Sequence, residues 1–205
     1  MAATFLNRGN CIFGNEALQR LLSRHLATDD FKATRVPLHI VATDLKRGEK
    51  VVLENGQVST AVVASAAIPG LFCPVTRGGR QLVDGGLIAD MDLDTAVRLG
   101  AEDIVAIDLT QPASSFRSGN ILEVFNRSLE VLLREQVRRD IERFSHQARI
   151  TVIRPQLDHA HTLASFSHIS HLIEEGERLG RQLLDRCLDG EGRLTCGLIT
   201  NEPES

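Results

Sequence analysis

The chain has 205 residues, a formal net charge of −4 and an isoelectric point near 6.0, and 42% of its residues are apolar. This length and composition predict one globular domain with a real core. Nucleic-acid binding is excluded, because no basic stripe occurs and Trp and Tyr are absent. The sequence also lacks the ~18 consecutive apolar residues of a membrane span and a signal-peptide pattern at its start.

Periodicity and capping residues predict helices and strands in alternation along the first half of the chain. We expect a helix at 15–26 capped by Asn15, strands at 38–43 and 50–54, a small-residue helix at 60–67 capped by Ser59, and short strands at 71–75 and 81–83.

The second half continues the alternation. We expect a helix at 93–99 between Asp92 and Gly100, a buried strand at 104–109, a long helix at 120–147, a strand at 149–155 and a helix at 167–187. We expect residues 1–190 to form one α/β domain around a central, mostly parallel sheet, and residues 191–205 to be a flexible tail.

The segment Gln81-Leu82-Val83-Asp84-Gly85-Gly86 is the first candidate for chemistry. An apolar strand ends in a carboxylate, and α/β folds place functional side chains at strand ends. The two glycines allow unusual backbone angles or the close approach of another group. The alternative is an ordinary Asp-Gly turn between two strands.

Three further blocks occur in a fixed order around this segment. They are Ala42-Thr43-Asp44-Leu45-Lys46-Arg47-Gly48-Glu49, the run from Ala64 to Pro74, which reads ASAAIPGLFCP, and Leu99-Gly100-Ala101. Together the blocks resemble the second half of a patatin-like phospholipase domain, over about residues 14–187. The resemblance implies a three-layer α/β fold and lipid acyl hydrolysis by a Ser-Asp dyad, with Asp84 at the aspartate position and no cofactor or metal.

The family's serine lies in a G-x-S-x-G elbow, preceded by a glycine-rich oxyanion loop, and neither occurs in this sequence. Ser65 is flanked by alanines and Ser118 by Arg117 and Gly119. The resemblance therefore implies a domain truncated at its N-terminus. Where the family tends to have a proline after the aspartate, this chain has Asp92.

Other residues are weaker candidates for a functional role. His159, His161, His168 and His171 are close in sequence but lack the further ligands of a zinc site. Asp44 is expected to stabilise a turn, and Gly70 and Phe72 to line an acyl pocket or simply to stop a helix and fill the core. Cys11, Cys73, Cys187 and Cys196 show no C-x-x-C spacing and are expected to be reduced thiols.

Two functions stay open. The first is a lipid acyl hydrolase, here without its nucleophile and inactive alone. The second is a non-catalytic remnant that serves as an interaction or regulatory module, or as half of a split enzyme. A cytoplasmic location is expected, with transient membrane contact, a lipid or acyl-ester partner and self-association through an exposed core. A G-x-S-x-G elbow encoded in frame upstream of Met1 would favour the hydrolase.

Overall fold

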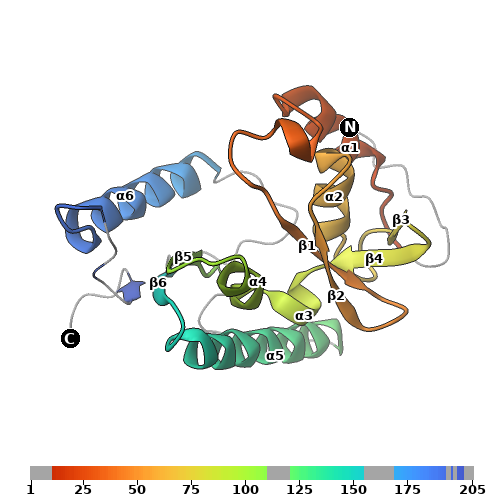
Figure 1. Ribbon diagram of the computed structural model, residues 1–205. Coiled ribbons are helices and arrows are strands. Elements are labelled where there is room, and N and C mark those ends of the chain that lie inside the picture. The colour runs from red at the N-terminus through yellow and green to blue at the C-terminus, as the bar shows by residue number, and fades with distance from the viewer. Residues whose placement is uncertain (1–10, 110–120, 155–168, 193–194, 196–197, 201–205) are drawn as a thin grey trace. The chain divides into compact units, whose positions relative to one another are not determined.

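The computed structural model describes residues 11–109, 121–154, 169–192, 195 and 198–200 (Figure 1). The chain divides into two compact units, residues 1–90 and residues 91–205. The α/β class predicted from the sequence is confirmed. Each unit has its own sheet, and each is described separately below.

The first unit contains an antiparallel sheet of four strands in the order β2-β1-β4-β3. The strands are β1 (Ile40–Asp44), β2 (Glu49–Leu53), β3 (Val75–Arg77) and β4 (Arg80–Asp84). Antiparallel pairing differs from the mostly parallel sheet that we expected. For the pairs β1–β2 and β3–β4 the reason is the short connection, since a tight turn can join only antiparallel strands.

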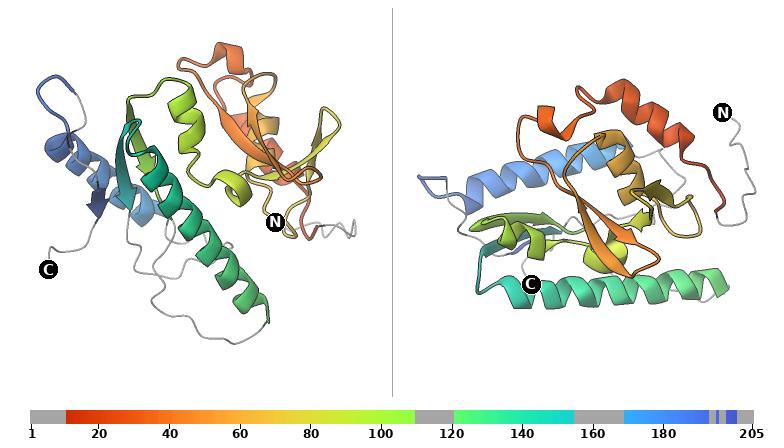
Figure 2. Two further views of the ribbon diagram at one scale, coloured as in Figure 1. Left: turned by 60° about the horizontal axis from the view of Figure 1, so that its bottom comes forward. Right: turned by 45° about the vertical axis from the view of Figure 1, so that its right-hand side comes forward.

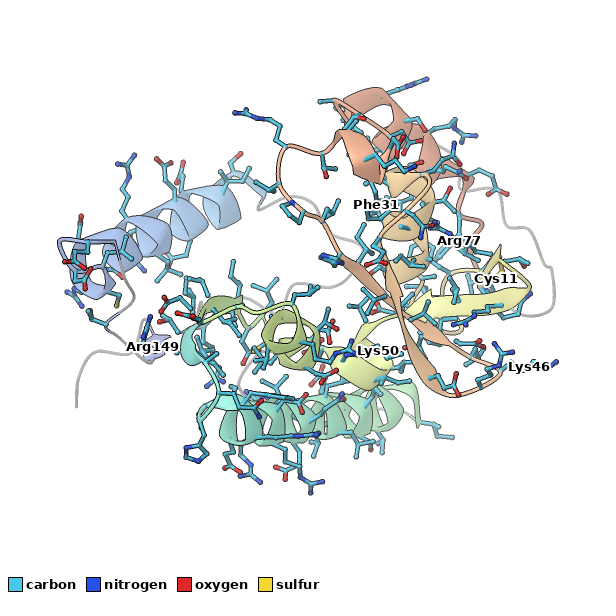
Figure 3. The ribbon with its side chains drawn as sticks, in the orientation of Figure 1. Cys11, Phe31, Lys46, Lys50, Arg77 and Arg149 are labelled. Atoms are coloured by element: carbon cyan, nitrogen blue, oxygen red, sulfur yellow. A yellow bond between two sulfur atoms is a disulfide. The ribbon has the colours of Figure 1, made fainter. Side chains whose placement is uncertain are left out.

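Two turns illustrate this point. Lys46 lies in the turn between β1 and β2 (Figure 3). Gly78 and Gly79 join β3 to β4 and have φ values of 56° and 74°. A two-residue hairpin turn of this kind needs left-handed backbone angles at both positions, which glycine adopts without strain.

The helices of the first unit are α1 (Glu16–His25), a 3-10 turn (Phe31–Ala33), α2 (Val58–Ser65) and α3 (Gly86–Ala89). Helix α2 packs on the sheet through small side chains, and Ala61 and Ala64 are completely buried. The core that they form also contains Phe31, Ala42, Leu53, Val58 and Leu82.

Helix α2 begins two residues earlier than predicted, and Ser59 is not its N-cap. Instead, Asp29 caps the helix from a distant part of the chain. Its two carboxylate oxygens accept hydrogen bonds from the Ser59 amide at 2.6 Å and the Ser59 hydroxyl at 2.9 Å. A carboxylate at this position satisfies amides that have no partner within the helix and complements the helix dipole.

The second unit contains three parallel strands in the order β5-β6-β7. The strands are β5 (Asp103–Ile107), β6 (Arg149–Arg154) and β7 (Leu198–Thr200). Figure 2 shows the long helix α5 (Ile121–Phe144) beside α4 (Leu93–Arg98). Parallel strands need such a long crossover connection, and here β5 reaches β6 through α5. Helix α6 (Ile169–Cys187) then precedes β7.

The core of the second unit lies between β5 and the helices α4 and α5. Its buried members are Leu93, Ile104, Ala106, Phe144 and Ala148. Asp92 caps α4 by accepting a hydrogen bond from the Thr95 amide, and Gly100 follows the helix at φ 88°, as predicted.

Two details of the second unit differ from expectation. Strand β5 was expected to be buried on both faces, but Val105 is 46% exposed and Ile107 is 63% exposed. A continuous apolar run does not reveal how many of its faces are covered. The interval 191–205, predicted as a tail, contains β7, which pairs with β6.

The prediction of reduced thiols is wrong. Cys11 and Cys73 form a disulfide, Cys187 is also disulfide-bonded, and no cysteine among the described residues is free. Main-chain hydrogen bonds from Phe13 to Leu71 and from Cys73 to Phe13 hold the two segments side by side. The Cα atoms of Cys11 (Figure 3) and Cys73 are thereby 4.9 Å apart, a normal separation for a disulfide.

Candidate active site around Asp84

Asp84 is the last residue of β4, and main-chain contacts from two other elements hold it in place. Its amide donates a hydrogen bond to the carbonyl of Ala67, just after α2, at 3.0 Å. Its carbonyl accepts one from the Thr43 hydroxyl of β1 at 2.9 Å. Asp84 is also the residue opposite Ala42 in the pairing of β1 with β4. The backbone of Asp84 is therefore fixed by the sheet and by the helix that covers it.

The glycines after Asp84 are needed for space rather than for unusual angles. Gly85 has φ −66° and ψ −27°, which any residue can adopt. However, a Cβ atom added to it would lie 2.4 Å from the carbonyl oxygen of Val41. A Cβ atom on Gly86 would lie 3.2 Å from the Asp84 carboxylate. The chain continues into helix α3, so the alternative of a turn between two strands does not hold.

The carboxylate of Asp84 is half-buried and accepts a hydrogen bond at Oδ1 from the Gly86 amide at 2.8 Å. Burial raises the pKa of this carboxyl above its ordinary value, because ionisation is less favourable away from water, and the Gly86 hydrogen bond opposes the rise. Within the described residues, Oδ2 makes no hydrogen bond. This oxygen can therefore accept a proton or a hydrogen bond from a reacting group.

The described residues bring no nucleophile to Asp84. Ser65 is the last residue of α2, and no hydrogen bond joins it to Asp84 in the part of the chain that the structure describes. A helix end of this kind is not the sharp strand-to-helix turn that exposes a nucleophilic serine. Ser118 lies outside the described residues.

Asp44, by contrast, stabilises a turn, as predicted. Its Oδ1 accepts hydrogen bonds from the amides of Lys46 at 3.1 Å and Arg47 at 3.2 Å. The side chain is 1% exposed and also forms ion pairs with Arg47 at 3.4 Å and Arg80 at 3.9 Å. A carboxylate with this many partners is a structural group rather than a base.

The remaining candidates contribute less. Gly70 has φ 80°, and Phe72 packs on Phe13 with ring centroids 6.0 Å apart, which fits a helix stop and local packing. The alternative that the two residues line an acyl pocket stays a prediction. His159, His161 and His168 lie outside the described residues, as does the side chain of His171. Among the described side chains, no group of three or more metal-binding residues occurs.

Sequence reasoning missed the supports of Asp84. The Thr43 hydroxyl and the Ala67 carbonyl belong to blocks that precede the Asp-Gly-Gly segment in the sequence. The pairing of β1 with β4 brings Thr43 to Asp84, and a main-chain hydrogen bond joins Asp84 to Ala67. The proximity of Val41 to Gly85 has no signal in the sequence beyond the glycine itself.

Residues 2–97 match the family model described as Patatin-like phospholipase. Over these residues, which are less than half of the chain, the sequence is similar to the patatin-like phospholipase family. The matched range includes β1, α2, β4 and Asp84.

Curated relatives show the same similarity. The chain is 35% identical over 74 residues to Uncharacterized NTE family protein Rv1063c of Mycobacterium tuberculosis, which covers 36% of this chain and 21% of that protein. It is 27% identical over 181 residues to Lysophospholipase nte1 of Aspergillus fumigatus, covering 78% of this chain and 12% of that protein. The chain is 28% identical over 100 residues to Patatin-like phospholipase domain-containing protein 6 of mouse, covering 48% of this chain and 7% of that protein.

The chain thus spans about a fifth or less of the length of these relatives. Within the described residues, no helix is both long and apolar enough to cross a membrane.

Proposed function

We propose that this chain is the aspartate-bearing part of a patatin-like lipid acyl hydrolase, and that Asp84 is the general base of a Ser-Asp dyad. The observation that carries the proposal is the state of the Asp84 carboxylate. It lies at a strand end, its backbone is fixed, its pKa is raised by burial and its Oδ2 makes no hydrogen bond within the described residues.

In the proposed reaction, Asp84 accepts the proton of a serine hydroxyl as the oxygen attacks the acyl carbonyl of a lipid ester. Burial raises the pKa of Asp84 toward neutral pH, where a carboxylate is a more effective general base. Asp84 returns the proton to the alcohol oxygen as the ester C–O bond breaks. It then accepts a proton from the water that attacks the acyl-serine and returns it to the serine oxygen, which releases the fatty acid. The substrate class is a phospholipid or lysophospholipid met at a membrane surface, which fits the name of the fungal relative.

The chain contains no G-x-S-x-G sequence, so we propose that the serine and the oxyanion loop come from a segment beyond these 205 residues. The chain alone would then bind no ester productively. A cytoplasmic site of action remains part of the proposal, but the thiols no longer support it, because the described cysteines are oxidised.

The test joins the chain in frame to the elbow-bearing segment of a patatin-like relative and measures lysophospholipid hydrolysis. We expect turnover that Asp84→Asn lowers by about 10²–10⁴-fold. The control is Glu49→Gln, an exposed carboxylate at the start of β2, which should change the rate little. Equal activity of the Asp84→Asn variant and the unsubstituted protein would contradict the base assignment and favour the non-catalytic alternative.

A further inference from the structure

A separate hollow in the second unit lies where β5 and β6 end. It encloses about 610 Å³, which is large enough for a small organic molecule rather than a bare ion. Asp108 and Arg154 line it from the ends of the two strands, and helix α5 contributes the other lining residues, Val131, Arg134, Glu135, Arg138, Ile141 and Glu142. The carboxyl ends of parallel strands are the usual place for ligands in open α/β sheets.

Most charges around this hollow are already paired. Arg154 donates to the buried Asp108 at 2.8 Å, with its Nε on Oδ2. Arg138 donates to Glu135 at 2.8 Å and also bonds Glu142. The charged groups in these pairs are already hydrogen-bonded to one another and do not need a ligand as a partner.

Glu135 takes part in a second pair that lies outside the lining. Arg139 donates to its Oε1 at 2.8 Å. Arg138 and Arg139 lower the pKa of Glu135 to about 2, so this carboxylate stays ionised at neutral pH and its oxygens are bonded to the two arginines.

Arg134 is different from the other arginines of the hollow. It is only partly exposed, and within the described residues it makes no hydrogen bond or ion pair. The lining contains three arginines and three carboxylates. Arg154 pairs with Asp108, Arg138 pairs with Glu135 and Glu142, and Arg139 pairs with Glu135 from outside the lining. Arg134 is therefore the lining arginine that has no counter-charge among the described residues.

The chemistry of the ligand follows from this arrangement. A guanidinium with free donors binds a carboxylate through two parallel hydrogen bonds. One guanidinium without a counter-charge matches a monoanion better than a dianionic phosphate, because a second negative charge would be repelled by the three carboxylates of the lining. Val131 and Ile141 add apolar surface beside Arg134 on the same helix.

We propose that this hollow binds a monocarboxylate with an apolar body, and that Arg134 holds the carboxylate. All the described lining residues belong to the second unit, and Asp84 is not among them. The proposal does not depend on the hydrolase assignment.

The test measures equilibrium binding of octanoate to the full 205-residue chain by calorimetry, with octanol and inorganic phosphate as comparison probes. We expect saturable octanoate binding, weaker binding of octanol and weaker binding of phosphate. Arg134→Gln should weaken octanoate binding about tenfold or more, since a charge-assisted hydrogen-bond pair is lost. Arg134→Lys should retain part of the affinity, because lysine keeps the positive charge but cannot donate the two parallel hydrogen bonds of a guanidinium.

The matched control is Arg127→Gln. Arg127 lies on the same helix, bonds Glu130 at 2.8 Å and does not line the hollow, so octanoate binding should be unchanged. Amide chemical shifts on octanoate addition should change around 131–142 and at 154. The proposal would be overturned if octanoate did not bind, or if octanol bound equally well or phosphate bound more tightly. It would also be overturned if Arg134→Gln and Arg127→Gln lowered the octanoate affinity equally.

Discussion

Replacing Gly85 by alanine tests the geometry that holds Asp84. The added Cβ atom would lie 2.4 Å from the carbonyl oxygen and 2.8 Å from the carbonyl carbon of Val41. Carbon atoms in contact prefer about 3.5–4.0 Å, so the chain around residue 85 and strand β1 must separate by about 1 Å. Both contact atoms are main-chain atoms, and no side-chain rotation can relieve the overlap.

The cost follows from where Val41 lies. It is paired with Val52 of β2, and its neighbour Ala42 is paired with Asp84, so a shift of β1 disturbs two strand pairings. Overpacking of this kind destabilises a domain by about 1–3 kcal/mol. For a unit of this size, each 1 kcal/mol lowers the melting temperature by about 4–8 °C.

Thermal melting followed by circular dichroism, together with amide hydrogen exchange of β1 and β4, measures the effect. The matched control is Gly180→Ala in α6, where an added Cβ atom meets no other atom within 4 Å. That substitution should stabilise its helix by about 0.5–1 kcal/mol. If the Gly85→Ala variant melts at the temperature of the unsubstituted protein, and its β1 and β4 amides are equally protected from exchange, the close-packing explanation of Gly85 is wrong.

Three further outcomes are expected. Asp84→Asn should raise the free energy of unfolding at neutral pH. Burial raises the pKa of Asp84 in the folded state, so the unsubstituted protein loses stability as the pH rises from about 3.8 through that pKa. Urea titrations should therefore give the two proteins more similar stabilities at lower pH. Asp29→Ala should cost about 0.5–2 kcal/mol in urea unfolding, because the amide and hydroxyl of Ser59 lose their acceptor, and unchanged stability would contradict the capping role. Cys11→Ser should cost about 2–4 kcal/mol, since the disulfide to Cys73 closes a loop across a sequence separation of 62, and a melting temperature insensitive to reductant would refute it.

Local patterns predicted most elements of this fold. The apolar periodicity of α5 and α6 and the caps of α4 act within a few residues, so the sequence reveals them directly. The position of Asp84 at the end of a strand was predictable for the same reason, since an apolar run precedes it and glycines follow.

Features that join distant segments were not predictable in this way. The cap from Asp29 to Ser59 spans 30 positions, and the Cys11–Cys73 disulfide spans 62. Strand direction depends on how each strand is connected, and the expected parallel sheet occurs only where α5 provides a crossover. The exposure of Val105 and Ile107 depends on what covers β5, which an apolar run cannot encode.

The site shows the same division. The motif around Asp84 identified the carboxylate, but its supports from Thr43 and Ala67 required the assembled sheet. Arg134, which makes no hydrogen bond or ion pair within the described residues, gives no signal in the sequence, because the same helix contains several other arginines and their partners depend on the folded structure.

The most direct measurement incubates the purified 205-residue chain with a fluorophosphonate probe and with a p-nitrophenyl acyl ester. The proposal that this chain supplies the aspartate but not the nucleophile predicts no labelled serine and no hydrolysis above the buffer rate. A labelled serine, or robust hydrolysis that Asp84→Ala abolishes, would mean that a serine within this chain completes the dyad and would contradict the account.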